Sequence, residues 1–214
     1  MPGWNIHLEA GNRLADKLRL KDKDRKAFLL GCILPDINQG YINSVQVTKP
    51  HAETHYNFNK KSSLNFYAEN QAQVDTRDPI FLGYLFHLYT DGYFNYDFYH
   101  SVKAHPLYKN LTHPQKARIK HHDFYIFDST MHHYIGIDNR EDAVELITLA
   151  NRIRPVELAP EDLEVVEKIL RDNVLNDSVR GKPYQFYTIE RLERLLEDTT
   201  DSFINDYLKG DQNA

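Results

Sequence analysis

GYLFHLYTDGYFN, residues 83–95, has the apolar and aromatic character of a buried helix, yet it carries His87 and Asp91. On a helix these two residues, four positions apart, share one face a single turn apart. Burying a polar or charged group without a partner is costly. Either a hydrogen-bonded pair or a shared metal ion would satisfy them, so we look for further partners in the rest of the chain.

The remaining sequence predicts an all-α protein. Apolar residues recur at spacings of three and four, and proline opens several segments, where its missing N–H does no harm. The expected helices are 5–19, 23–33, 61–75, 78–99, 113–134, 140–152, 160–175 and 185–208. Two long connections, 34–60 and 100–112, are expected to be non-helical, and loops of that length are often functional.

Composition describes a globular chain of 214 residues, 41% of them hydrophobic. We expect a single domain over 1–214, in which residues 1–134 form a metal-bearing core. Amphipathic helices within 140–214 would pack on this core or provide the face of a homodimer. No apolar run approaches the ~20 residues that cross a bilayer, so no transmembrane segment is expected.

Charge and cysteine content restrict the partners and the compartment. The formal net charge of −5 argues against duplex nucleic acid as a partner but leaves small phosphorylated substrates open. Cys32 is the only cysteine, which excludes an internal disulfide, and the charged N-terminus does not resemble a secretory signal. We therefore expect a cytoplasmic protein.

Histidine is the strongest compositional signal. All eleven histidines lie between His7 and His133, and the remaining third of the chain has none. Histidines and aspartates recur in otherwise apolar stretches, at His7, Asp36, His51, His55, His121, His122, Asp123 and Asp128. Taken singly, each fits a hydrogen-bonded core residue, a solvated loop residue or a helix cap. Imidazole and carboxylate together suit Zn²⁺, Fe or Mn²⁺, and a metal centre would satisfy all of these groups at once.

The order of these motifs resembles the zinc-dependent phospholipase C family over roughly residues 3–130. The likeness rests on an early histidine, LPD at 34–36, THY at 54–56 and GYLFHLYTD at 83–91. It implies two zinc ions: His7 would hold one, and a neighbouring ion would be held by Asp36, His55 and His87. Asp91 would bridge the two, and His55 is preferred over His51 because THY is similar to the family's SHF.

The sequence departs from the family pattern in two places. The secreted enzymes use the amino group of an N-terminal tryptophan, whereas Trp4 lies only three residues before His7, so that ligand is expected to be absent. The family's His-x-x-x-Glu pattern for a third metal is also missing from the fifth predicted helix. Similar small members have a His-x-Asp there, which implies that His121 and Asp123 complete or orient the site, with His122 as the alternative to them.

The resemblance implies hydrolysis of a phosphoric ester, above all a phosphodiester, in a small phosphorylated substrate or a phospholipid head group. Two metal ions would activate water and neutralise phosphoryl oxygens, with Asp36 as ligand, catalytic base or both. An alternative is an HD-type nucleotide phosphohydrolase, suggested by HHD at 121–123. Another is a non-catalytic helical module that uses the cluster for structure or metal sensing.

Overall fold

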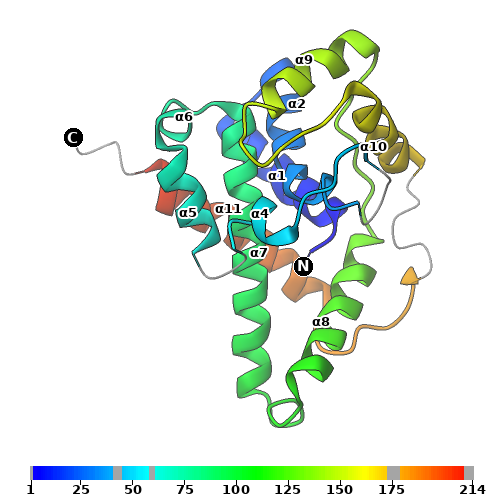
Figure 1. The fold of residues 1–214 in the computed structure, drawn as a ribbon. Helices are drawn as coiled ribbons and strands as arrows, with labels where there is room; N and C mark the ends of the chain where they lie inside the picture. The colour runs from blue at the N-terminus through cyan, green and yellow to red at the C-terminus, as the bar shows by residue number, and fades with distance from the viewer. Residues whose placement is uncertain (1, 41–44, 58–60, 173–178, 210–214) are drawn as a thin grey trace.

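The computed structural model describes residues 2–40, 45–57, 61–172 and 179–209. These ranges contain helices and no strand, so the predicted all-α fold class is confirmed (Figure 1). The elements are α1 (Trp4–Leu18), α2 (Asp22–Gly31), α3 (Leu34–Ile37), α4 (His51–Thr54), α5 (Ser62–Glu69), α6 (Gln71–Asp75), α7 (Pro79–Ala104), α8 (His113–Asp128), α9 (Arg140–Ala150), α10 (Pro160–Asp172), α11 (Ile189–Phe203) and a π-helical turn (Ile204–Leu208).

Helix α7 is the central element of the fold. Every residue from Ile80 to Leu88 is buried, because this half of the helix is apolar all round and neighbours cover it on every side. The second half of α7 extends toward one end of the molecule, with α8 alongside it (Figure 1), and an ion pair between Asp97 and Arg191 joins it to the start of α11. The metal-ligand candidates of α7 lie where the buried half gives way to this extension.

Two glycines allow α2 to approach α7 very closely. A Cβ atom on Gly83 would lie 2.1 Å from the carbonyl oxygen of Phe28, and one on Gly31 would lie 2.5 Å from the carbonyl oxygen of Ile80. Real Cβ atoms do not come so close to a carbonyl oxygen. The two backbones therefore meet at residues that have no Cβ atom. The contact brings the C-terminal end of α2 against the turn of α7 that carries His87.

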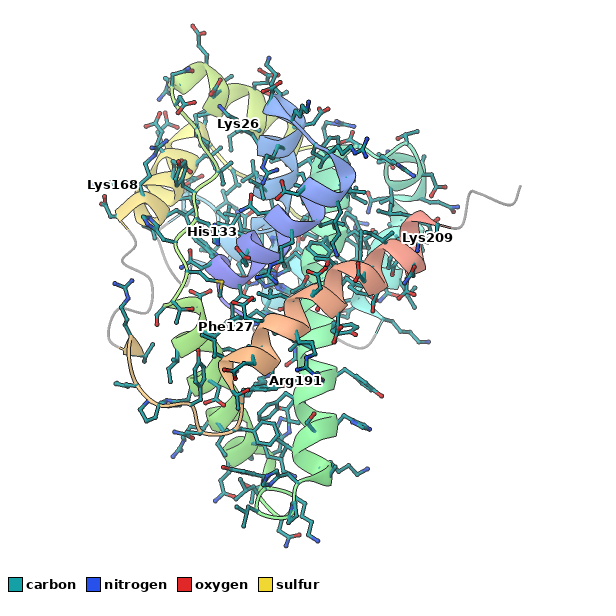
Figure 2. The ribbon with its side chains drawn as sticks, turned by 180° about the vertical axis from the view of Figure 1, so that it is seen from behind. Lys26, Phe127, His133, Lys168, Arg191 and Lys209 are labelled. Carbon is teal, nitrogen blue, oxygen red and sulfur yellow. The ribbon has the colours of Figure 1, made fainter. Side chains whose placement is uncertain are left out.

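Helices from the C-terminal third pack on the earlier ones. Helix α9 contacts α2, α10 contacts α9, and α11 lies across α1 and α7, as Figure 2 shows from behind. Several ion pairs join α11 to α1, among them Arg13 to Glu193 at 2.5 Å and Lys17 to Asp201 at 2.7 Å. None of the helices in the described ranges is both long and apolar enough to cross a membrane.

Several predicted helix ends were wrong. The predicted helix 78–99 continues to Ala104, because helix is disfavoured only at His105, the residue before Pro106. The predicted helix 113–134 ends at Asp128, where the Ser129 and Thr130 hydroxyls donate to carbonyl oxygens of the last turn.

The segment 61–75 is broken into two helices at Asn70. The side-chain amide of this residue donates to the carbonyl oxygen of Phe66 at the end of α5. Helix α2 ends at Gly31 rather than near Leu34, and Pro35 falls in the first turn of the separate helix α3. The end of the predicted helix 160–175 lies outside the described residues, beyond Asp172.

Candidate metal centre

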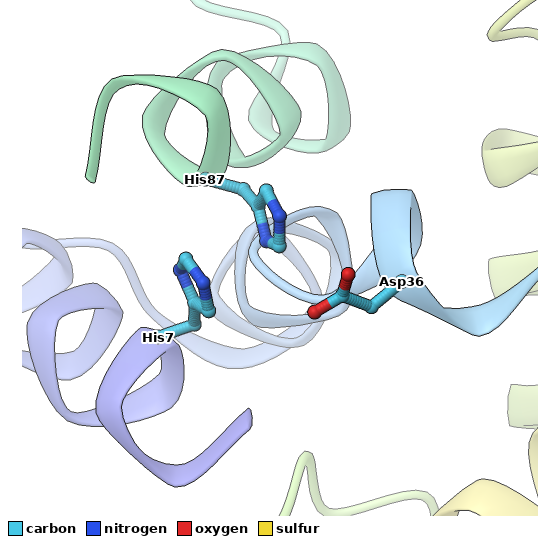
Figure 3. Close-up of side chains that lie close together, drawn as sticks. All are labelled: His7, Asp36 and His87. Atoms are coloured by element: carbon cyan, nitrogen blue, oxygen red, sulfur yellow. The ribbon is translucent and has the colours of Figure 1, made fainter. Parts of the chain in front are cut away.

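Four segments bring five side chains together in the interior. His7 comes from α1, Asp36 from α3, His55 from the residue after α4, and His87 and Asp91 from α7. Figure 3 shows the His7, Asp36 and His87 side chains pointing toward one another. All five residues are buried, with at most 8% of their surface exposed. The structure therefore joins five of the seven predicted ligands, and their role as ligands stays a prediction.

Asp91 lies between three imidazoles. Its Oδ1 is 3.4 Å from Nε2 of His7, and its Oδ2 is 3.5 Å from Nε2 of His55 and 3.8 Å from Nε2 of His87. Nε2 of His55 is also 3.5 Å from Oδ1 of Asp36. The rings of His7 and His87 stack with centroids 3.9 Å apart. The carboxylate of Asp91 is thus placed to be shared between groups on both sides.

Backbone and side-chain groups orient two of the imidazoles from behind. Nδ1 of His87 lies 2.8 Å from the carbonyl oxygen of Cys32, which the close approach of α2 brings to this place. Nδ1 of His55 lies 3.0 Å from Oγ1 of Thr54 and 3.0 Å from Nε2 of Gln39. Because a carbonyl oxygen can only accept, the neutral ring of His87 carries its proton on Nδ1 and presents the Nε2 lone pair on its other side, as metal-binding histidines do.

Burial and neighbouring charges set the protonation of these groups. Burial lowers the pKa of His87 well below its ordinary value and the pKa of His55 to about 3, so both rings are neutral near neutral pH. Burial and the charge of Asp91 raise the pKa of Asp36 to about 7. Burial also acts to raise the pKa of Asp91, but the neighbouring imidazoles of His7, His87 and His55 outweigh it and keep that pKa below its ordinary value.

The buried polar atoms of the cluster fit a metal ion. Within the described part of the chain, both ring nitrogens of His7, Oδ1 of Asp36 and both carboxylate oxygens of Asp91 have no hydrogen-bond partner. Two overlapping sets have ligand atoms within 4.8 Å of one another: His7, Asp36 and His87, and His55, His87 and Asp91. Neutral imidazoles and carboxylates at such spacing suit zinc. A bound ion would replace the hydrogen bonds to water that these atoms lost when they were buried.

A model of the family described as zinc dependent phospholipase C matches residues 6–161. The chain belongs to the zinc-dependent phospholipase C family. The matched range contains the whole cluster, and membership supports Zn²⁺ as the metal and hydrolase as the general class of this phospholipase C family protein. No curated protein and no solved structure matches the chain.

The other two predicted ligands of this family member, both on α8, lie outside the group. The buried carboxylate of Asp123 accepts hydrogen bonds from the backbone N–H groups of Gln185, Phe186 and Tyr187, at 2.7 to 2.8 Å. These three donors explain its burial, so it anchors the 185–187 segment to α8. His121 instead lines a cavity beside the metal centre, and burial lowers its pKa to about 4.

The remaining histidines and aspartates considered from the sequence also have structural roles. Nε2 of His122 lies 3.1 Å from the carbonyl oxygen of Pro183, and Asp123 accepts hydrogen bonds from the 185–187 backbone, so the adjacent His-Asp pair of the HD-type interpretation lies outside the cluster. Oδ1 of Asp128 accepts a hydrogen bond from the backbone N–H of Ile6, which ties α8 to the start of the helix that carries His7. The His51 ring stacks on His55, with centroids 4.0 Å apart.

Sequence reasoning missed Lys120 and Asn95, which lie beside the site. Lys120 is buried on α8, and its ammonium donates to Oδ1 of Asn95 at 2.6 Å. Burial lowers the pKa of Lys120, while the charge of Asp91 acts to raise it. The sequence did carry a signal, because Lys120 shares a helical face with Phe124 and Phe127, and a lysine on an apolar face is rare.

Proposed function

We propose that this protein hydrolyses phosphoric esters, above all phosphodiesters, at a binuclear metal site. His7, Asp36, His55, His87 and Asp91 would hold the ions, two zinc ions in the first place and iron or manganese as alternatives. One observation carries the proposal: Asp91 faces three imidazoles, and neither of its carboxylate oxygens has a hydrogen-bond partner among the described residues. The cluster offers five ligand side chains, more than the four that one zinc ion takes in a closed site, and this number favours a pair of ions over a single one.

The side chains of the protein itself would position the metal ligands and accept a proton. Bound zinc would supply the Lewis acid that makes water nucleophilic near neutral pH and offsets the charge of a phosphoryl group. Cys32 and Thr54 hold the imidazoles of His87 and His55 so that Nε2 points inward. Asp36 would act as a ligand, as the catalytic base, or as both.

The site opens into a cavity, which favours catalysis over a purely structural role. His55 and Asp91 both line that cavity, so a substrate could reach the ligands. Structural zinc sites are closed by four protein ligands, whereas catalytic ones leave a position open. The substrate would be a small phosphorylated molecule or a phospholipid head group; the cytoplasmic location and the homodimer stay predictions.

The test is metal content by elemental mass spectrometry together with hydrolysis of bis-p-nitrophenyl phosphate. The wild-type protein should hold close to two zinc ions and hydrolyse the ester, whereas Asp91→Ala should lose most of the metal and the activity. Asp172→Ala, at an exposed position at the end of α10, is the control and should match wild type. Wild-type protein without metal after incubation with zinc would refute the proposal.

A further inference from the structure

A cavity of about 670 Å³ lies between α7 and α8, beside the metal centre. His55 and Asp91 form the part that belongs to the centre, and the walls include Asn95, Tyr99, Lys120 and His121. A space of this size suits a small molecule or the head group of a larger one. We call it the α7–α8 cleft.

Lys120 is the unusual group in this cleft. Only 6% of its surface is exposed, and its ammonium contacts the neutral amide oxygen of Asn95 at 2.6 Å and the ring of Tyr99, 5.2 Å from the centroid. In the ranges that the structure describes, Lys120 makes no ion pair. A buried ammonium that forms no direct ion pair is unfavourable unless a ligand supplies the paired negative charge.

Asn95 connects this cation to the metal centre. Its amide nitrogen donates to the carbonyl oxygen of Asp91 at 2.8 Å, and its amide oxygen accepts from Lys120. Asp91 and Asn95 are one helical turn apart on α7, so the amide holds the ammonium on the side of α7 where the Asp91 carboxylate also lines the cleft. An ester whose phosphoryl group reaches the metal centre would therefore come within reach of Lys120.

Charge along the cleft favours an anionic ligand. Its lysines, Lys103 and Lys120, face a single carboxylate among the described lining residues, and that carboxylate, Asp91, belongs to the metal centre. Tyrosine rings can bind a quaternary ammonium group by cation–π attraction. In this cleft, however, the ring of Tyr99 already lies against the ammonium of Lys120, so a second cation there would be repelled.

We propose that Lys120 binds the phosphoryl group of the substrate and makes the cleft select esters with neutral or anionic head groups over those with quaternary ammonium head groups. This inference rests on the proposed function, because it places the scissile phosphoryl group at the metal centre. Asn95 is a positioning residue that acts through Lys120.

Two chromogenic diesters and one product-like ligand test the inference. The variants are Lys120→Met and Lys120→Arg, and the matched control is Lys116→Met, one turn earlier on α8, whose ammonium bonds to the carbonyl oxygen of Lys109 and does not line the cleft. The substrates are bis-p-nitrophenyl phosphate and p-nitrophenyl phosphorylcholine. Glycerol phosphate binding, measured by calorimetry, gives a readout that does not depend on turnover.

Wild type should prefer the diester without a cationic head group and should bind glycerol phosphate more tightly than phosphocholine. Lys120→Met should lose about 10- to 100-fold in kcat/KM for that diester and in glycerol phosphate affinity, the size expected for one charge-assisted hydrogen bond. The loss on the choline ester should be smaller, so the preference should shrink. Lys120→Arg should keep part of the kcat/KM for that diester and part of the glycerol phosphate affinity. Lys116→Met should match wild type.

Thermal unfolding separates binding from a structural role. Removing an unpaired buried cation should leave the Tm of Lys120→Met at or above that of wild type. A lower Tm with equal losses on both esters would overturn the inference and make Lys120 structural. Unchanged preference and binding in an active Lys120→Met would overturn it while leaving the proposed function intact. Lys120-dependent glycerol phosphate binding without hydrolysis of either ester would support it and count against the proposed function instead.

Discussion

At the scale of single residues, buried aspartates of this protein differ by the groups that face them. Asp91 and Asp123 are both buried, and both were predicted from the sequence as ligands. The carboxylate oxygens of Asp123 accept hydrogen bonds from three backbone N–H groups, whereas those of Asp91 face imidazoles and accept no hydrogen bond from the described residues. A carboxylate that already accepts hydrogen bonds from amides gains little free energy by binding a metal. A buried carboxylate without hydrogen-bond partners gains much more.

This contrast predicts opposite phenotypes for two alanine substitutions. Asp123→Ala should lower the free energy of unfolding by about 3 kcal/mol, because three backbone N–H groups, that of Tyr187 buried, lose a charged acceptor. Its metal content should remain that of wild type. Chemical denaturation and elemental mass spectrometry on the same samples check both statements. Loss of metal at unchanged stability would instead restore Asp123 as a ligand.

At the scale of elements, the packing of α2 on α7 depends on Gly83. A methyl group there would meet the carbonyl oxygen of Phe28 at 2.1 Å, whereas one on Gly92, further along the same helix, would meet nothing within 4 Å. Gly83→Ala should therefore destabilise the protein by about 3 kcal/mol or more through overpacking. Gly92→Ala should stabilise it by about 0.5–1 kcal/mol, the helix-propensity gain of alanine over glycine.

Thermal unfolding of the two glycine variants against wild type measures this difference. Both substitutions add one methyl group to α7, so the pair controls for the change in composition. Equal Tm values for the two variants would show that α2 can move away from α7 at little cost, and the contact would lose its role in placing Cys32 behind His87.

At the scale of the whole molecule, the clustered His and Asp side chains come from four segments that are distant in sequence, and the proposed metal ions would join these segments. Chelation should leave unpaired buried ligands on α1, α3 and α7 and at the end of α4, and so lower the Tm. Zinc at 100 times its dissociation constant should add about 2.7 kcal/mol, or roughly 5–10 °C in Tm for a chain of this length. Calorimetry of chelated and zinc-loaded protein measures the shift.

The same titration on Asp91→Ala is the control for specific binding. Its Tm should change little with zinc, because the carboxylate that faces three imidazoles is gone. A zinc-dependent rise as large as that of wild type would place the stabilising ion elsewhere in the molecule.

The sequence by itself determined the all-α class, the central helix around residues 83–95 and the polar positions in apolar stretches, from which the family resemblance selected the five residues that gather at the centre and also His121 and Asp123, which do not join them. The class, the helix and the polar positions follow from local properties, because apolar spacing sets the helices and polar groups in apolar stretches must find partners wherever the chain folds. Helix ends were less predictable. Whether a helix stops at Asp128 or before Asn70 depends on side chains that bond to carbonyl oxygens three or four positions earlier, and such residues also occur inside helices, so apolar spacing alone does not locate the end.

Only the tertiary structure decided how the residues of α8 are used. Asp123, Asp128 and Lys120 lie within nine positions of one another, but they face the 185–187 backbone, the start of α1 and the α7–α8 cleft respectively. Nothing local distinguishes them, because helical spacing fixes which residues share a face but not which partner that face meets. Their partners come from segments 25 to 123 positions away along the chain. The packing of those segments determines whether each charged group anchors another segment, caps a helix or stays available for a ligand.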